Sequence, residues 1–190
     1  MKIVRIFDNC LFAIIYDEES TDEFDRIFNI WNDVDYLENF FESNKTDIQN
    51  SYWDINSVDE AIIKTINDAK KFEKILLDLS EKSNEVQAKG LETLFKPLIN
   101  SQVQKVELNK SKAKQNWLRI YALRIENSIY LITGGAIKLT ATMQEREHTK
   151  IELFKLEKCR KYLLAQGIID VEGVIEEIEI SDHEKRKNIE

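Results

Sequence analysis

The chain has 190 residues, of which 43% are hydrophobic and 33% charged, and a formal net charge of -8. That is enough apolar sequence for one core of ordinary size, whereas no stretch approaches the roughly 20 apolar residues of a membrane-spanning helix, and the start lacks the apolar run of a signal peptide. Two cysteines and two histidines argue against a disulfide framework and a histidine-rich metal centre, so we expect a cytoplasmic protein with no metal, cofactor or membrane contact.

The N-terminal part is predicted to begin with a sheet element. Residues 2–7 and 10–16 are rich in β-forming residues and are separated by the turn-forming pair Asp8-Asn9. This pattern predicts one strand or a small hairpin. A capping box at residues 20–23 then begins a helix that continues or restarts through residues 36–41.

A second helix has the most regular apolar stripe in the chain. It begins at a capping box in residues 57–60, and its apolar residues recur at helical spacing as far as Leu79. After residue 83 the pattern lapses, and Pro97 argues against another long helix there. A loop-rich connection is expected between this helix and the second half of the chain.

From Trp117 onward the sequence takes on β character. Three runs rich in β-formers, WLRIYALRI, IYLIT and AIKLTAT, are separated by the pairs Asn127-Ser128 and Gly134-Gly135. Two turn signals at this spacing predict a three-stranded antiparallel meander. A third capping box, at residues 149–152, begins a C-terminal helix that Gly167 ends.

The predicted fold class is therefore α+β: an N-terminal strand or hairpin, two helices, a three-stranded antiparallel meander and a C-terminal helix. Residues 1–166 are expected to form one domain, with an acidic half (1–88) and a basic half (89–166), followed by an acidic tail (167–190). The basic half has 15 Lys and Arg against 7 Asp and Glu, so its net charge is +8 and the remainder carries -16. This asymmetry favours a polyanionic partner for the basic half, unless the acidic parts pack beside it.

One face of the meander is expected to be open to solvent and to carry two cations. If both turns contain two residues, Arg124 lies opposite Leu131 and Leu131 opposite Lys138, so the cations share a face. The other, more apolar face should meet the helices, with Arg119 and Tyr121 on that side near its edge. A bulge at the glycine pair would instead shift the third strand by one residue.

The segment before the meander is rich in lysine. Lys110, Lys112 and Lys114 alternate with small residues and precede Trp117. Lysines can follow a phosphate backbone through their charge while an aromatic ring stacks on a base. The alternative is a solvated basic loop, with Trp117 anchoring the start of a strand.

Arg146 and His148 lie at the start of the last predicted helix. A helix N-terminus favours anions, so a phosphate near Thr149 could be held by backbone amides with Arg146 beside it. His148 is the one side chain of this central region whose usual pKa suits proton transfer near neutral pH. A surface histidine next to a helix cap is the alternative interpretation.

The segment LRIYALRIENSIYLITGGAIKLTATMQ, with the helix predicted for residues 149–166, resembles the RelE/ParE-like toxins of bacterial toxin–antitoxin systems, particularly the RelE/HigB-type ribonucleases. The similarity lies in an Arg-bearing strand, a short turn, an apolar strand and a Gly-led strand with Lys and then Thr, before a basic helix. The upstream segment FKPL is also similar to one often found in the family. The match covers residues 94–166, and elsewhere only the order of elements agrees.

This resemblance implies a toxin that cleaves messenger RNA without a metal, commonly on the ribosome. It also implies a cognate antitoxin protein that covers the active face of the toxin. It implies that Arg124 and Lys138 bind the phosphate and the transition state. It also implies that the lysine run, Lys110, Lys112 and Lys114, contacts RNA. We expect Arg119 and Arg146 to bind RNA as well. In such a mechanism the 2′-hydroxyl attacks phosphorus and a general acid protonates the leaving oxygen, a role that chemistry gives to His148 or Tyr121.

Two other functions remain open at this stage. The chain has few acid–base groups, and its acidic N-terminal half could engage a basic partner in a non-catalytic protein-binding module with the meander as scaffold. The resemblance also allows an inhibitor of DNA gyrase, because members of this family differ in target. The long acidic half and the acidic tail depart from the family pattern, and the tail could lie over the basic surface.

Overall fold

The computed structural model describes residues 1–17, 19–49, 53, 55–83, 90–98, 108–126, 128–140 and 147–187. Over these residues a six-stranded sheet has the order β1-β2-β6-β5-β4-β3. Its strands are β1 (Lys2–Phe7), β2 (Leu11–Ile15), β3 (Lys96–Pro97), β4 (Asn109–Gln115), β5 (Leu118–Glu126) and β6 (Ile129–Ile137). Neighbouring strands are antiparallel except β2 and β6, which pair in parallel.

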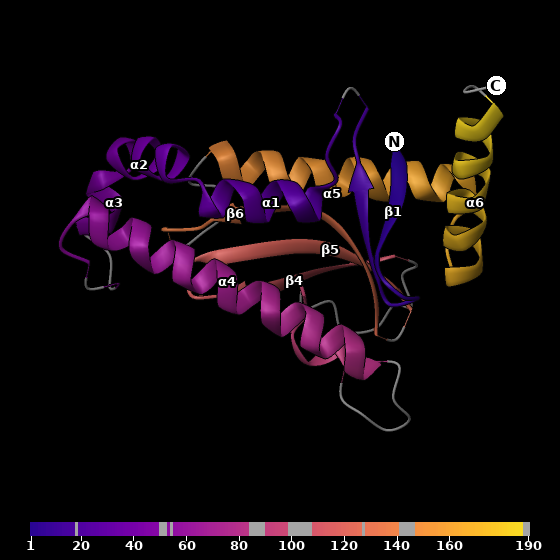
Figure 1. The fold of residues 1–190 in the computed structure, drawn as a ribbon, viewed down its shortest axis with the longest axis horizontal. Coiled ribbons are helices and arrows are strands. Elements are labelled where there is room, and N and C mark those ends of the chain that lie inside the picture. The colour runs from indigo at the N-terminus through magenta and orange to yellow at the C-terminus, as the bar shows by residue number, and fades with distance from the viewer. Residues whose placement is uncertain are drawn as a thin grey trace.

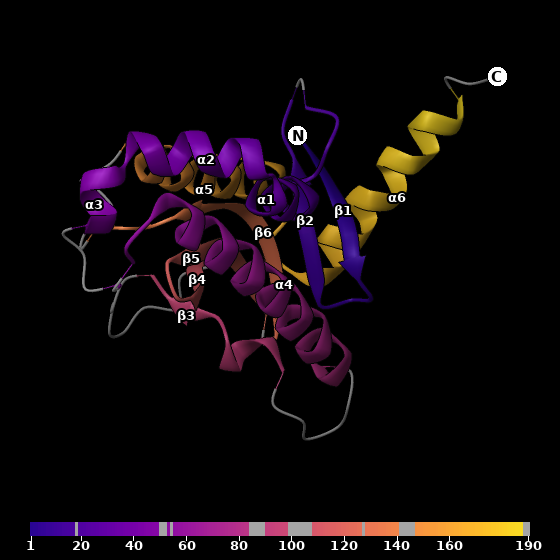
Figure 2. The same cartoon turned by 60° about the vertical axis from the view of Figure 1, so that its left-hand side comes forward.

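Helices cover both faces of this sheet, and each face has its own hydrophobic cluster (Figure 1, Figure 2). One face packs on α1 (Glu23–Asn32), α2 (Val34–Ser43), α3 (Lys45–Gln49), α4 (Val58–Ser83) and the 3-10 helix η1 (Leu91–Thr93). The other packs on α5 (Glu147–Gln166) and α6 (Val171–Lys187). In the described part of the chain, no helix is both long and apolar enough to cross a bilayer.

Local sequence signals set the starts of the N-terminal helices. At the start of α1, the Asp22 carboxylate accepts hydrogen bonds from the backbone N–H groups of Phe24 and Asp25. At the start of α4, the Ser57 hydroxyl accepts one from the backbone N–H of Glu60. The helix start predicted at residues 57–60 is therefore confirmed.

The predicted fold class, a RelE-like three-stranded meander with two helices before it and one after it, is wrong. The described residues form a mixed six-stranded sheet and six helices, which that arrangement does not fit. One cause is the lysine run, which forms strand β4 instead of a loop because Ser111 and Ala113 between the lysines are small and buried. Another is the N-terminal hairpin, whose β2 joins β6 in parallel, and a third is the helix α6 in the predicted tail.

Gly134 and Gly135 lie inside β6 and do not form the predicted turn. A Cβ on Gly135 would lie 2.9 Å from the Arg119 carbonyl oxygen and 2.9 Å from Ile27 of α1. A Cβ on Gly134 would overlap the Glu152 carboxylate of α5. The pair therefore allows the helices on both faces to approach β6 closely.

The predicted register and the predicted open face are also wrong. Arg124 lies opposite Tyr130, while the backbone N–H of Lys138 donates to Trp117 at the far end of β5. Arg124 and Trp117, the residue before β5, are seven positions apart, or about 23 Å at strand spacing. The face expected to be open instead buries three β5 side chains beneath α1, α2 and α4: Leu118, Ile120 and Ala122.

Candidate functional site

Three lysines of β4 point to one side of the sheet. Lys110, Lys112 and Lys114 occupy alternate positions, while the buried residues Ser111 and Ala113 point to the other side. Ala113 belongs to the hydrophobic cluster beneath α4, so the lysines face the side that carries α5. Lys114 is exposed, and Lys110 and Lys112 are half-buried.

Strand pairing extends this cationic surface. Lys114 lies opposite Arg119 of β5, and Lys112 lies between Tyr121 of β5 and Lys96 of β3. Residues directly opposite each other point to the same side of a sheet. We call the surface formed by the three lysines of β4 the basic face: Lys110, Lys112 and Lys114.

The edge of α5 borders the basic face. The Lys110 ammonium forms an ion pair with Glu157 at 2.5 Å, and this contact lowers the pKa of the Glu157 carboxyl. The guanidinium Nε of Arg160 donates to the Leu108 carbonyl oxygen at 3.2 Å. Neither Lys112 nor Lys114 forms an ion pair with a described residue. The basic face therefore keeps an excess of positive charge at its solvent side.

Arg119 and Tyr121 belong to this side of the sheet but lie beneath its surface. Arg119 is only 8% exposed, and its guanidinium donates to the carbonyl oxygens of Asn116 at 2.5 Å and Leu118 at 2.8 Å. It thus holds the β4–β5 turn. Tyr121 is fully buried, and burial raises the pKa of its hydroxyl above the usual value. The Tyr121 hydroxyl is consequently poorly placed to protonate a leaving group in solvent.

Arg124 lies on the opposite side of the sheet, near η1. Its guanidinium Nε donates to the Glu126 carbonyl oxygen at 3.3 Å. Although burial acts to raise the pKa of Glu92, a hydrogen bond from Ser128 and the charge of Arg124 lower it. Arg124 is therefore part of a polar group that also contains the buried Tyr130, whose pKa burial raises.

His148 lies at the other end of the sheet, next to the end of β6. The His148 Nε2 atom lies 2.8 Å from the carbonyl oxygen of Ile137, the residue before Lys138. The imidazole also packs edge-on against the Phe40 ring, with centroids 5.2 Å apart. Arg146 lies outside the described residues. The four predicted catalytic residues therefore occupy three places: Arg124 near η1, Tyr121 in the core, and Lys138 and His148 at the end of β6.

Sequence reasoning missed a buried charge cluster between α1 and α5, formed by Glu23, Arg26, Glu152 and Lys155. The Glu23 carboxylate, 2% exposed, accepts hydrogen bonds from Arg26 at 2.6 and 2.9 Å and from the Lys155 ammonium at 2.6 Å. Arg26 also lies 3.5 Å from Glu152. The cluster occupies the edge of β6 where β2 stops pairing, beyond the Ala13–Ile132 pair.

Within this charge cluster, burial raises the pKa of Glu152 to about 7, against the opposing charges of Lys155 and Arg26. Glu152 can therefore exchange a proton near neutral pH. Its partners are charged groups of the same cluster, and the Lys155 ammonium also lies 4.7 Å from the centre of the Tyr16 ring. The cluster pairs its charged groups with one another and joins two helices, so we interpret it as structural. Only the Glu23 capping-box position was visible in the sequence, because its partners are far along the chain.

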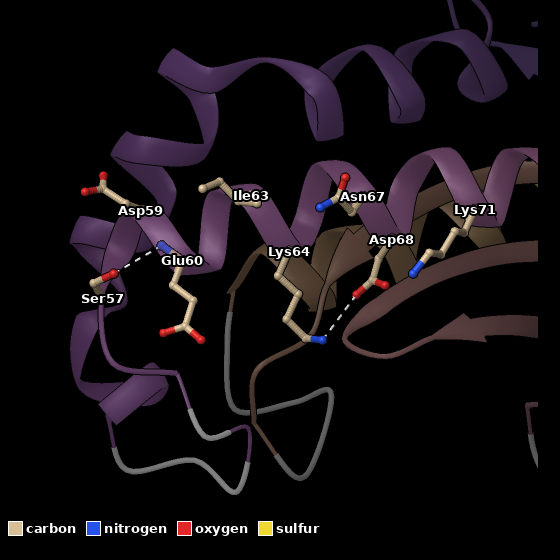
Figure 3. Close-up of a pocket in the computed structure, with 8 residues that line it drawn as sticks. All are labelled: Ser57, Asp59, Glu60, Ile63, Lys64, Asn67, Asp68 and Lys71. Atoms are coloured by element: carbon tan, nitrogen blue, oxygen red, sulfur yellow. Dashed lines mark hydrogen bonds and ion pairs between the residues drawn. The ribbon is translucent and has the colours of Figure 1, made fainter.

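A pocket of about 600 Å³ lies along α4 (Figure 3). It is lined by Ser57, Asp59, Glu60, Ile63, Lys64, Asn67, Asp68 and Lys71. Asp68 is buried and accepts a hydrogen bond from the Asn116 side chain at 2.6 Å, while Lys64 lies over the Trp117 ring at 5.7 Å. Trp117 is itself fully buried and donates to Thr65, so it anchors a strand start. These contacts attach the β4–β5 turn to α4.

Among the described residues, no group of three His, Cys, Asp or Glu side chains is placed to hold a metal ion. Comparisons with protein-family models, curated proteins and solved structures gave no significant match. The basic face is the surface described above on which two lysines, Lys112 and Lys114, have no ion-pair partner among the described residues.

Proposed function

We propose that the protein binds RNA through the basic face. The observation that carries the proposal is the alternation of Lys110, Lys112 and Lys114 on one side of β4, with two of the three free of ion pairs to described residues. Consecutive lysines on one strand face are separated by roughly 6.6 Å, so they form a row of charges that can follow a phosphate backbone. The choice of RNA, and of messenger RNA in particular, rests on the resemblance of residues 94–166 to RNA-cleaving toxins.

Binding can be measured by fluorescence anisotropy with a labelled single-stranded RNA over a range of salt concentrations. Replacing Lys112 and Lys114 together by Gln should weaken binding about tenfold and reduce the slope of log Kd against log salt by about 1.4. The matched control replaces Lys70 and Lys71, two exposed lysines of α4, by Gln. Equal losses in both double variants would show that binding is not specific to the basic face.

The ribonuclease toxin is the second candidate, and it is favoured by the contact of His148 with the carbonyl oxygen of Ile137, the residue before Lys138. In this form of the proposal Lys138 stabilises the charge that develops on phosphorus. If Nε2–H of His148 donates to the Ile137 carbonyl, Nδ1 is left to exchange a proton with the RNA. A cognate antitoxin would then cover the RNA-binding side, and the ribosome would present the message.

Controlled expression in a bacterium tests this stronger form, with growth recorded while new 5′ ends are mapped in total RNA. The ribonuclease proposal predicts rapid arrest with cuts inside translated messages, and loss of both in His148→Gln and Lys138→Met. Arrest with DNA damage before any loss of RNA would favour gyrase inhibition instead. Normal growth with intact RNA would reject cleavage while leaving RNA binding to be judged by the anisotropy measurement.

A further inference from the structure

The solvent side of α5 combines large apolar groups with lysines. Phe154 is 70% exposed and Ile151 50% exposed, although neither has a polar atom in its side chain. Lys150, Lys158 and Lys161 are also exposed, and they lie within two turns of Phe154 on the same side of the helix. We call these five side chains the α5 stripe. Three carboxylates lie near these lysines: Glu147 lies 3.5 Å from Lys150, Glu157 interacts electrostatically with Lys161, and Asp17 does so with Lys158.

The last helix, α6, has the opposite charge. Val174 is fully buried and Ile178 packs partly on the same cluster, which attaches this part of the helix to the body of the molecule. The rest of α6 projects away from the body (Figure 2). Four exposed side chains on its outer side form what we call the α6 stripe: Glu172, Glu176, Glu179 and Ile180.

The two stripes match in charge and in length. The α5 stripe has three lysines and two apolar side chains, and the α6 stripe has three carboxylates and one isoleucine. At 1.5 Å per residue the α5 stripe is about 16 Å long and the α6 stripe about 12 Å. Ile180, 50% exposed, gives α6 an apolar group that could lie against Phe154.

The α6 stripe cannot meet the α5 stripe of its own chain. Val174 and Ile178 hold α6 against β1 and the C-terminal end of α5, so the outer side of α6 points away from the molecule. The α5 stripe lies on the side of α5 opposite its buried residues Leu156, Cys159 and Leu163. A partner that carries an acidic and apolar helix would therefore have to come from another molecule.

We propose that two copies of this chain associate by placing the α6 stripe of each on the α5 stripe of the other. Such a reciprocal contact closes on itself and gives a dimer in place of an open chain of molecules. The contact goes beyond RNA binding, because the basic face lies on β4 and contributes none of the nine residues involved. Its charge complementarity predicts that association weakens as salt rises.

Charge reversal in full-length protein tests the dimer, with mass measured by sedimentation equilibrium. The wild type should be dimeric, whereas Lys158→Glu/Lys161→Glu and Glu176→Lys/Glu179→Lys should each be monomeric. An equimolar mixture of the two variants should recover the dimer, because each copy then meets a stripe of opposite charge. Circular dichroism shows whether the variants are folded, and Lys70→Glu/Lys71→Glu on α4 is the matched control that should remain dimeric.

Three results would overturn the proposal. A wild type that remains monomeric at high concentration would reject self-association. A dimer that neither reversal weakens would place the interface elsewhere. Variants that are each monomeric but remain so when mixed would show that the two stripes do not bind each other. If the α5 reversal instead weakens RNA binding in a monomeric wild type, the α5 stripe belongs to the RNA surface.

Discussion

Two charged regions of this protein lie on either side of α5 and differ in how their charges are compensated. In the buried cluster, Glu23 and Glu152 face Arg26 and Lys155 at hydrogen-bonding or ion-pair distance, and the four groups join α1 to α5. On the basic face, Lys112 and Lys114 lack an ion-pair partner among the described residues. Buried charges need partners to be tolerated, whereas exposed excess charge attracts a ligand. The comparison teaches that fully paired, buried charges belong to the scaffold, whereas exposed lysines without an ion-pair partner among the described residues mark the binding surface.

The largest effect is expected from breaking the balance of the buried cluster. Glu23→Ala should lower the free energy of unfolding by about 3 kcal/mol, because Arg26 and Lys155 lose their shared carboxylate. Urea unfolding measures the change. Glu42→Ala, which removes an exposed pair with Lys45, is the control and should change stability by less than about 1 kcal/mol. Equal effects would mean that the cluster is not structural.

The buried cluster should also make stability depend on pH. Glu152 has a folded-state pKa of about 7, above the usual carboxyl value, so the folded state binds a proton more tightly than the unfolded state. The free energy of unfolding should therefore rise as the pH falls from 8 towards 5, by roughly 2–3 kcal/mol, and level off near the unfolded pKa. Unfolding curves measured across this range should flatten in Glu152→Gln. If Glu152→Gln keeps the pH dependence of the wild type, another group causes that dependence.

The close approach of α1 to β6 is tested by Gly135→Ala. The new methyl group would lie 2.9 Å from the Arg119 carbonyl oxygen and from Ile27, and the resulting overpacking should reduce stability by about 2 kcal/mol. Gly173→Ala, in α6, provides the control, since a Cβ there meets its nearest atom at 3.3 Å and alanine favours helix. Thermal unfolding of both variants would distinguish them, and a neutral Gly135→Ala would contradict the packing described.

The smallest effect should come from removing the carboxylate that pairs with a lysine of the basic face. Glu157→Gln removes the ion-pair partner of Lys110 and should strengthen RNA binding about threefold, because one more cation becomes available to phosphate. Fluorescence anisotropy at low salt measures this gain. The control Glu81→Gln, an exposed carboxylate of α4, should change the affinity less. Unchanged or weaker binding in Glu157→Gln would remove Lys110 from the proposed RNA surface.

The sequence predicted features that depend on neighbouring residues. The capping box at residues 57–60, the apolar stripe of α4 and the buried side of α1 agree with the structure because each depends on contacts within a turn or two of helix. The charge of the lysine run was also visible, but its strand conformation was not. Alternation of Lys with Ser and Ala lacks the β-branched and aromatic residues that mark a strand.

Features that depend on distant residues were not predictable in the same way. A glycine pair between β-rich runs has the same local pattern whether it forms a turn or lets a helix pack closely on a strand. Here it does the second, because Ile27 of α1 and Glu152 of α5 lie against the two glycines. The parallel pairing of Leu11 with Tyr130 has no local signal, and the cluster around Glu23 needs Lys155 from the other half of the chain. The wrong position of Lys138 followed from the same glycine pair, whereas the wrong partner of Arg124 followed from an irregularity between Arg124 and Glu126 in β5.

The pairing of β2 with β6 also sets an order of assembly during synthesis. The hairpin of β1 and β2 is made first, yet β2 completes its place in the sheet only when Tyr130 to Ile132 have left the ribosome. Until then the apolar residues Leu11, Phe12 and Ile14 remain without their native cover. Contacts between distant segments form slowly, and exposed strand edges promote aggregation. The nascent chain is thus most vulnerable early in translation, and its N-terminal strands are the place where a chaperone would act.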